Sequence, residues 1–192
     1  LVALERTVPG VRVIRIRPIL VPSRWFRTRA LAELASCVIA GMAGMIAARR
    51  PRLVVATTPA MFLGPVGATV ARLLGAPFVW DVRDLIWEYV GEEVGNGAPA
   101  RWLRRIMART AASASVITTS TQAQACYFDA GNGTSARVVC VPNPADPAWL
   151  ERTKSIADAY PDRCSGGHES LTVLYAGLLG IPQGLQVILD TA

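Results

Sequence analysis

The sequence predicts an α/β fold, a Rossmann-like domain built on a parallel sheet. Short apolar runs of strand length alternate with longer helical segments, and that order produces parallel strands joined by right-handed crossovers. The strand at Phe78–Val82 gives the second observation, because its apolar start leads directly into the charged residues Asp81, Arg83 and Asp84. Ligands of open α/β sheets bind beyond the carboxyl ends of the strands, so this charged turn is the first candidate for a site.

The first element is a strand at Val11–Arg17. Apolar and basic residues alternate there with a period of two, which indicates one apolar face and one solvated face, and Pro18 ends the strand. The preceding Leu1–Gly10 mixes Glu5 and Arg6 with few apolar residues. That segment does not have the pattern of a signal peptide.

An apolar helix is predicted over about Thr28–Arg50, with arginines before and after it. Its length approaches the roughly 20 residues that span a bilayer. It also contains Glu33, many alanines and two glycines, and the arginines at both ends give no topogenic charge asymmetry. We therefore expect a buried core helix. A helix lying in the membrane interface and a membrane-spanning helix are the alternatives.

Three elements are predicted around the strand at Phe78–Val82. Leu53–Thr57 is a short, continuously apolar run, typical of a parallel strand buried on both faces, and a helix with an apolar stripe follows at Phe62–Gly75. Gly91–Pro99 is rich in Gly and Asn and predicts a loop. The next helix, Pro99–Ser113, has one apolar face and one face of arginines, which we interpret as a solvated face rather than an anion site.

The predicted sheet continues with two more strands. Val116–Thr119 reads as a buried strand, and Ser120 or Thr121 can cap the helix that runs from there to Ala130. Val138–Val141 gives the last strand before a proline-rich break.

The break divides the predicted domains. Residues 1–142 are predicted to form a first domain, incomplete at its start, and the polar residues 143–170 to connect it to a second. Residues 171–192 predict the start of a second Rossmann-like domain, with a strand at Leu171–Ala176, a glycine turn at Gly177–Gly184 and a helix at Leu185–Leu189. Because the chain lacks an initiator methionine and ends abruptly, we expect a piece of a longer protein.

The composition limits the classes of function. A net charge of +6 and a pI near 9.7 suit nucleic acid, an anionic membrane or phosphate-bearing substrates, but the arginines are spread over several elements without a nucleic-acid motif. The four cysteines form no CxxC pair, so we expect reduced thiols and neither a zinc site nor a disulfide framework. The one histidine, His168, lies in a polar, Gly-rich stretch and is expected to be a loop residue.

Two stretches carry residues suited to chemistry. Arg83 could hold a phosphate or carboxylate as a bidentate donor, and Asp81 or Asp84 could orient a hydroxyl group. The alternative is an Asp–Arg pair that only ties the strand tip to a neighbouring loop. The glycines of Gly177–Gly184 would let backbone amides approach a diphosphate at a helix N-terminus, and a tight packing turn is an equal alternative.

Three motifs together resemble a known family. Pro77–Trp87, PFVWDVRDLIW, resembles the strand and acidic turn in the N-terminal half of family 4 glycosyltransferases. Val138–Asp146, VVCVPNPAD, is similar to that family's interdomain segment. Leu174–Leu185, LYAGLLGIPQGL, is similar to the first strand and glycine loop of its donor-binding domain, above all in bacterial surface-polysaccharide enzymes. The matches occur in the family's order and cover most of the chain.

The resemblance implies a retaining transferase of the GT-B type, with two Rossmann-like domains. Such an enzyme moves a sugar from a nucleotide-diphosphate-sugar donor to a glycan or lipid-linked acceptor and needs neither a metal nor a cofactor. The implied acceptor-side residues are Thr57, Thr58, Asp81, Arg83 and Asp84. The implied donor-diphosphate residues are Gly177, Gly180, Gln183 and Gly184, and the implied hinge residues are Asn143 and Asp146.

The sequence departs from the family pattern at several positions. Arg83 stands where many members have histidine, Pro144-Ala145 replaces Gly-Val in the hinge, and Gln183 stands in place of a phosphate-binding lysine. The family's opening strand with its glycine loop and its later paired glutamates have no counterpart within the sequence. We therefore expect this chain alone to be inactive, and no catalytic residue is assigned.

Two other functions stay open. A sugar-nucleotide epimerase of the same architecture would need acidic residues and histidines in its cleft, and the single histidine counts against it. A non-catalytic basic module could instead bind an anionic membrane or a partner protein through its arginines. Because polysaccharide acceptors are frequently lipid-linked, a cytoplasmic enzyme held peripherally on the inner face of the plasma membrane would combine both roles.

Overall fold

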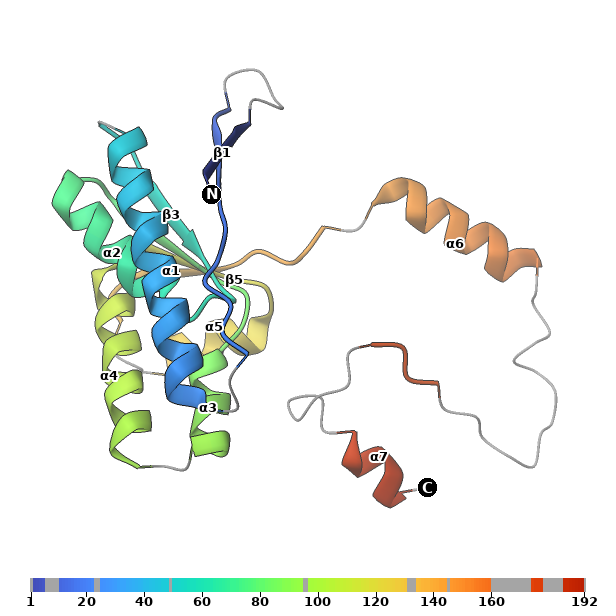
Figure 1. Cartoon of the computed structure of the whole chain (residues 1–192). Helices are drawn as coiled ribbons and strands as arrows, with labels where there is room; N and C mark the ends of the chain where they lie inside the picture. The colour runs from blue at the N-terminus through green and yellow to red at the C-terminus, as the bar shows by residue number, and fades with distance from the viewer. Residues whose placement is uncertain are drawn as a thin grey trace. The chain divides into compact units, whose positions relative to one another are not determined.

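A computed structural model describes residues 2–5, 11–22, 25–48, 50–94, 97–130, 134–144, 146–159, 174–177 and 185–191. Contacts within the chain divide it into two compact units, Leu1–Pro142 and Asn143–Ala192 (Figure 1). The first unit contains the sheet and the candidate site. Each unit is described by itself.

The first unit is built on a parallel sheet of four strands, so the predicted α/β fold is confirmed. The strands lie side by side in the order in which the chain forms them, and the predicted bounds hold to within one residue. They are β3 (Val54–Thr57), β4 (Phe78–Val82), β5 (Val116–Thr119) and β6 (Arg137–Cys140). The register places Thr57 opposite Asp81 and Asp81 opposite Thr118, so these side chains form one row across the sheet.

Helices connect the strands as predicted, and local signals fix their ends. Gly75 ends one helix in the left-handed region at φ 63°, and Thr121 begins another with a capping box that includes Gln124. The prediction of a loop at Gly91–Pro99 is wrong for its first half, where a helix continues to Val94. The helical spacing of the apolar residues Ile86, Trp87 and Val90 outweighs the effect of one glycine. The helices are α2 (Leu63–Leu74), α3 (Ile86–Val94), α4 (Ala98–Ser113) and α5 (Gln122–Asp129).

The core lies between these helices and one face of the sheet. Trp80 of β4 is fully buried and stacks on Trp87 of α3 with ring centroids 5.3 Å apart, while Phe128 of α5 approaches its edge. Gly64 and Gly67 allow α2 to pack closely on the sheet, because a Cβ atom at Gly64 would lie 2.5 Å from Trp80 Nε1. Aromatic packing therefore fixes how α3 and α5 pack on this face of β4.

The opposite face of the sheet is more exposed. Val55 of β3 is 56 % exposed, so the prediction that this strand is buried on both faces is wrong. The reason is that α2 packs on the face of β3 that carries Ala56, while Val55 points to the opposite face. A short apolar run indicates a strand, but it does not show which neighbours the strand will have.

The N-terminal part of the unit contains an antiparallel hairpin that the sequence did not predict. The strand β2 (Val13–Ile16) lies where a strand was expected, and β1 (Val2–Glu5) pairs with it in antiparallel fashion. The expectation that all strands are parallel is therefore wrong for this pair. β1 has only four residues, and a hairpin partner of that length is determined by cross-strand pairing rather than by its own pattern.

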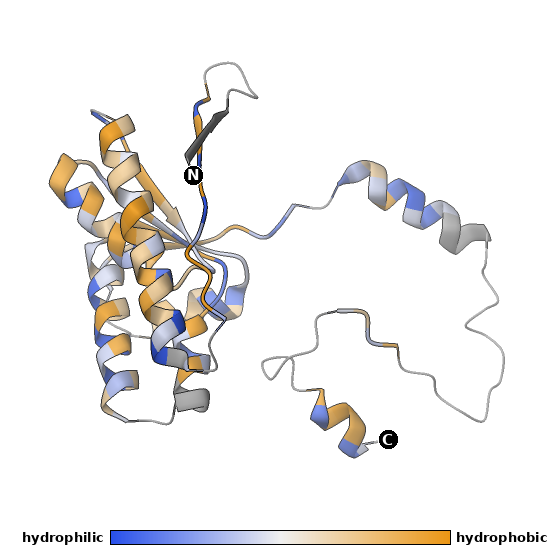
Figure 2. Cartoon of the chain, in the orientation of Figure 1, coloured by the Kyte–Doolittle hydropathy of each residue, from blue (hydrophilic) through white to orange (hydrophobic). Residues whose placement is uncertain are grey.

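The long apolar helix α1 (Phe26–Ala47) forms where predicted, but it is not a buried core helix. It packs against α2, where a Cβ atom at Gly41 would lie 2.6 Å from Val66. Among the described residues of α1, only Ala32 and Cys37 are buried. The ribbon of α1 has mostly hydrophobic colours (Figure 2). Its exposed large hydrophobic residues form an apolar stripe of Leu31, Val38, Ile39, Met42 and Ile46, which are 41 to 79 % exposed.

The second unit contains α6 (Pro147–Ala159) and α7 (Gln186–Thr191). The prediction of an irregular connection over 143–170 is wrong for α6, which Asp146 begins by accepting a hydrogen bond from the Ala148 amide at 2.9 Å. The predicted buried strand does not form at Leu174–Ala176, where Leu174 is 87 % exposed. A strand needs a hydrogen-bonded neighbour, and the described residues of this unit provide none.

Candidate functional site

The carboxyl ends of β3, β4 and β5 bring polar residues together at one edge of the sheet. Each strand contributes side chains at or just after its last residue, because parallel strands all end at the same edge. All five predicted acceptor-side residues lie in this cluster: Thr57, Thr58, Asp81, Arg83 and Asp84.

Asp81 is the centre of the cluster. Its Oδ2 accepts a hydrogen bond from Arg83 Nε at 2.8 Å, and its Oδ1 accepts one from the Thr118 hydroxyl at 2.6 Å. The Asp81 side chain is 13 % exposed and the Arg83 side chain 33 % exposed, so the ion pair is partly shielded from water. Both carboxylate oxygens therefore have a fixed donor and a fixed direction.

The surroundings of Asp81 keep its carboxyl group ionised. Burial raises its pKa, but the hydrogen bonds from Arg83 and Thr118, the positive charge of Arg83 and a hydrogen bond from Thr57 lower it by more. The pKa of Asp81 consequently lies below its ordinary value. At neutral pH the group is an acceptor of hydrogen bonds and not a proton donor.

Thr58 fixes the backbone of the charged turn. Its side chain is buried, and its hydroxyl oxygen accepts hydrogen bonds from the amides of Arg83 at 2.7 Å and Asp84 at 3.1 Å. Its own amide donates to the Asp81 carbonyl at 2.9 Å. This predicted site residue is therefore a positioning residue, because its hydroxyl points into the turn and not outward.

Sequence reasoning missed the contribution of β5 and α5. The Thr118 hydroxyl donates to Asp81, and Gln124 Nε2 donates to the Arg83 carbonyl at 2.9 Å. Ser120 Oγ donates to Gln124 Oε1 at 2.9 Å and so orients that amide. Val116–Thr119 was predicted as a strand, but only the pairing of β5 with β4 in the assembled sheet places Thr118 opposite Asp81.

The arrangement can bind hydroxyl groups. It offers an ionised carboxylate beside a guanidinium group at the end of a strand, with the exposed side chains of Thr57 and Asp84 next to them. Such a pair can accept from one hydroxyl and donate to another, which is how proteins hold polyhydroxylated ligands. The Arg83–Asp81 pair lies within one turn, so it also fixes the tip of β4, but it does not tie that tip to a neighbouring loop as the alternative interpretation expected.

The residues predicted on the donor side belong to the second unit. Gly177 is described, and a Cβ atom there would lie 2.7 Å from the Tyr175 hydroxyl oxygen. Gly180, Gln183 and Gly184 lie outside the described residues. Of the predicted hinge residues, Asn143 is exposed and Asp146 begins α6.

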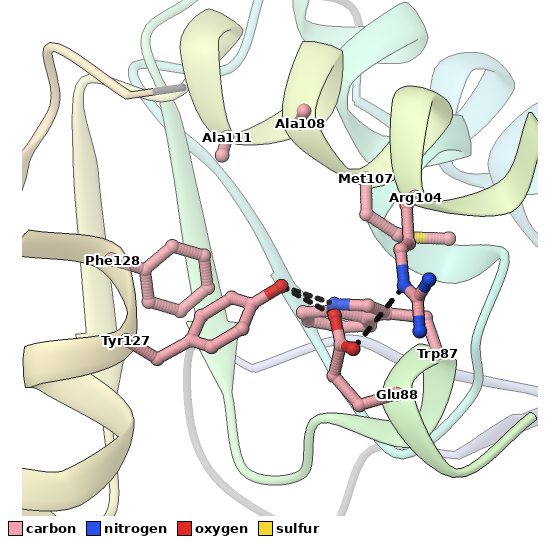
Figure 3. Close-up of a pocket in the computed structure, with 8 residues that line it drawn as sticks. All are labelled: Trp87, Glu88, Arg104, Met107, Ala108, Ala111, Tyr127 and Phe128. Atoms are coloured by element: carbon pink, nitrogen blue, oxygen red, sulfur yellow. Dashed lines mark hydrogen bonds and ion pairs between the residues drawn. The ribbon is translucent and has the colours of Figure 1, made fainter. Parts of the chain in front are cut away.

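Away from the cluster around Asp81, a cavity of about 370 Å³ lies between α3, α4 and α5 (Figure 3). Tyr127 OH donates to Glu88 Oε1 at 2.6 Å and accepts from Trp87 Nε1 at 3.1 Å. Arg104 Nε donates to the other Glu88 oxygen at 3.3 Å. These groups satisfy one another, so we interpret the chain of hydrogen bonds as a link between the helices. Arg104, one of the arginines of α4, thus pairs with Glu88 while its side chain is 39 % exposed.

The described residues contain no group of three or more His, Cys, Asp or Glu side chains placed to hold a metal ion. Cys37, Cys126 and Cys140 are free thiols. Burial raises the pKa of the Cys37 thiol to about 11, with the nearby Glu33 charge as a smaller cause. Cys37 is therefore a protonated, apolar packing residue at neutral pH.

Comparison with known families gives one match. The model of the glycosyl transferase 4-like domain matches residues 3–144, which include the whole parallel sheet and the cluster around Asp81. The chain belongs to this family. Comparison with curated proteins and with solved structures gives no match. A glycosyl transferase 4-like domain has a general role in glycosyl transfer and acts on a sugar donor and an acceptor.

Proposed function

We propose that the first unit is the acceptor-binding side of a retaining glycosyltransferase. The enzyme would transfer a sugar from a nucleotide-diphosphate-sugar to a glycan or lipid-linked acceptor in the synthesis of cell-surface polysaccharide. The observation that carries the proposal is the ionised Asp81, held between Arg83 and Thr118 at the carboxyl edge of a sheet that lies within the matched family domain. A site at that edge is where open α/β sheets bind ligands.

In this proposal Asp81 and Arg83 orient the acceptor. The Asp81 carboxylate accepts a hydrogen bond from an acceptor hydroxyl, and Arg83 donates to a neighbouring oxygen. The Thr57 hydroxyl, exposed at the end of β3, is a further contact. Since Asp81 is already ionised and directed by two donors, it can position a hydroxyl without rearranging. Its low pKa favours this positioning role over that of a proton donor.

The donor side is proposed from the resemblance alone. Gly177, Gly180, Gln183 and Gly184 would lie against the diphosphate of the donor, with Asn143 and Asp146 at the hinge between the domains. The proposal requires no metal and no cofactor, because backbone amides and a helix N-terminus supply the positive potential for the diphosphate.

The test is a transfer assay with the protein expressed from its whole reading frame. Labelled UDP-sugars and GDP-sugars are offered with a membrane lipid extract, and NMR of the product determines whether the anomeric configuration is retained. We expect Asp81→Asn to lower kcat/KM for the acceptor at least ten-fold and to leave KM for the donor unchanged. Asp129→Asn, an exposed carboxylate at the end of α5, is the matched control and should retain full activity.

Transfer at an undiminished rate in Asp81→Asn would remove Asp81 from the acceptor site. Absence of transfer from any nucleotide sugar would instead favour a non-catalytic binding module.

We also propose that α1 holds the enzyme on the cytoplasmic face of the plasma membrane. The helix is long and apolar enough to cross a membrane by length and composition, yet one side of it is packed on α2 and its Glu33 accepts from the Phe62 amide at 3.3 Å. It therefore lies along the domain, with its apolar stripe outward and the exposed Arg27 and Arg50 near its two ends. That pattern is typical of helices lying in the membrane interface.

Flotation with vesicles of phosphatidylcholine and phosphatidylglycerol tests this contact. Ile46→Ser, a change in the stripe at a residue 79 % exposed, should reduce the bound fraction. Leu73→Ser on α2, at a residue 68 % exposed, is the control and should bind as the wild type does. Equal loss in both variants, or no vesicle binding by the wild type, would contradict the proposal.

A further inference from the structure

A nearly wholly apolar groove of about 280 Å³ lies beside the first turns of α1. Ala30 and Leu34 of α1, Met61 and Phe62 before α2, and Leu103 of α4 line it. Met61, Phe62 and Leu103 belong to the buried core, so the groove is a continuation of the core to the surface. Its walls are rigid, because the starts of three helices and the packed core build them.

The mouth of the groove has a different composition. Trp102 of α4 and Leu31 of α1 line it and are 58 % and 66 % exposed. Arg27 also lines the groove, is exposed, and is the one charged residue among the described residues that line it. An exposed tryptophan beside an arginine at the edge of an apolar cavity is the combination that membrane interfaces favour, because the ring and the guanidinium group both suit the headgroup layer.

The groove is continuous with the stripe of α1 proposed to contact the membrane. Leu31 belongs to both, and Val38, Met42 and Ile46 follow it along the same side of the helix at spacings of seven, four and four residues. A bilayer that meets this stripe would also meet the mouth of the groove. On α4, Arg101 and Arg105 are exposed and lie on either side of Trp102 in the sequence.

We propose that this groove binds one acyl chain of an anionic phospholipid. The chain lies against Ala30, Leu34, Met61 and Phe62, and the phosphate of the headgroup meets Arg27 at the mouth. The apolar lining selects a hydrocarbon over a polar ligand, because a polar group inside would lose its hydrogen bonds to water. The volume of about 280 Å³ lies just below the range of about 300–1,000 Å³ that is typical of small-molecule pockets, and it has room for part of one acyl chain. The charge at the mouth selects an anionic headgroup over a neutral one.

The inference goes beyond the proposed membrane contact of α1 and rests on it for the supply of the lipid. Lipid binding in the groove would make the membrane contact of α1 specific in orientation, since a bound chain fixes how the first unit lies on the bilayer. Adhesion by the stripe alone depends on vesicles, whereas the groove should bind a lipid monomer in solution. The two proposals can therefore fail separately.

The probe is dihexanoylphosphatidylglycerol below its micelle concentration, titrated calorimetrically into the full chain, with dihexanoylphosphatidylcholine as the neutral counterpart. We expect a single site that prefers the anionic lipid. Arg27→Gln should weaken binding of the anionic lipid about five-fold and leave the neutral one unchanged. Ala30→Phe should abolish binding of both lipids, because the new ring fills the groove.

Ala35→Phe is the matched control for bulk, since Ala35 lies on the same helix and does not line the groove. It should bind the monomer as the wild type does. If Ala30→Phe does not fold, Trp102→Ser removes the exposed wall of the groove instead and should weaken binding of both lipids.

Three results would overturn the inference. The first is no binding of the monomeric lipid, and the second is equal affinity for the anionic and neutral lipids. The third is undiminished binding in Ala30→Phe, or in Trp102→Ser where that variant replaces it. Flotation of the same variants separates the two proposals. Ile46→Ser should lose vesicle binding and keep monomer binding. Monomer binding without any vesicle binding would contradict the membrane contact of α1 and leave the groove established.

Discussion

The Asp81 carboxylate on β4 accepts a hydrogen bond from the Thr118 hydroxyl on β5 at 2.6 Å. The two residues are 37 positions apart in the sequence and face each other because the parallel register places them in one row. Arg83 holds the other carboxylate oxygen from within the same turn. The candidate site thus consists of one local pair and one cross-strand pair, and each can be disrupted separately.

Asp81 should contribute acid-sensitive stability. Its folded-state pKa lies below its ordinary value, so folding favours the ionised form. That contribution is complete above the ordinary aspartate pKa of about 3.9 and is lost as the pH falls through the lower folded value. Asp81→Asn should lower the free energy of unfolding by about 2 kcal/mol at neutral pH, since two donors lose a charged acceptor.

Urea unfolding between about pH 3 and pH 7 measures this effect. The difference between wild type and Asp81→Asn should shrink as the pH falls. Asp129→Asn again serves as the control, because a substitution at this exposed residue should change the stability by no more than about 0.5 kcal/mol. A constant difference at every pH would show that packing, and not ionisation, is affected.

Thr58 should be needed for the shape of the charged turn. Thr58→Val keeps the volume of the side chain but leaves the Arg83 and Asp84 amides without their acceptor. The expected cost is about 1–3 kcal/mol in the free energy of unfolding, together with loss of acceptor binding at Asp81. Thr58→Ser keeps the oxygen and should retain most of both. Equal behaviour of the two variants in denaturant titration would show that the hydroxyl does not fix the turn.

The parallel sheet could be predicted because its signals are local. Each of Phe78–Val82 and Val116–Thr119 is an apolar run bounded by turn residues, and Gly75 and Thr121 mark helix ends through backbone conformation and capping. The burial of these elements was predicted less well than their position. The exposure of Val55 depends on which face of β3 a helix covers, and the sequence of β3 does not contain that information.

The candidate site was predicted in part for the same reason. Asp81, Arg83 and Asp84 are adjacent in sequence and could be recognised as a charged turn. Thr118 and Gln124 join them only through strand register and helix placement, which are properties of the assembled sheet. The apolar groove beside α1 was not predictable at all, because Ala30, Met61 and Leu103 have ordinary hydrophobic patterns in three separate segments.

The hydrogen-bonded chain at Tyr127 should make stability sensitive to alkali. Burial and the hydrogen bond to Glu88 raise the Tyr127 pKa to about 12, against the smaller effects of Trp87 and Arg104. A raised pKa means that the unfolded state loses its proton first. The contribution of Tyr127 is therefore complete below about pH 10 and is lost as the pH rises through about 12.

Tyr127→Phe should reduce this alkaline loss. It should also cost about 1 kcal/mol at neutral pH, because Glu88 loses a donor and Trp87 Nε1 loses an acceptor. Tyr89→Phe, at an exposed residue of α3, is the control. Thermal unfolding followed by circular dichroism between about pH 8 and pH 11 tests this prediction. If the Tm values of wild type and Tyr127→Phe fall in parallel as the pH rises, the raised pKa is contradicted.

Gly64 should be irreplaceable where α2 crosses Trp80. A Cβ atom there would lie 2.5 Å from Trp80 Nε1 and 2.8 Å from Cε2, and the indole cannot retreat because it stacks on Trp87 at 5.3 Å. Gly64→Ala should therefore destabilise the unit by about 1–3 kcal/mol in spite of the better helix propensity of alanine. Gly44→Ala in α1 meets no atom within 4 Å and should stabilise by about 0.5–1 kcal/mol. In chemical denaturation, Gly64→Ala should lower the free energy of unfolding and Gly44→Ala should raise it if α2 packs on the sheet at this distance. An increase in both variants would show that it does not.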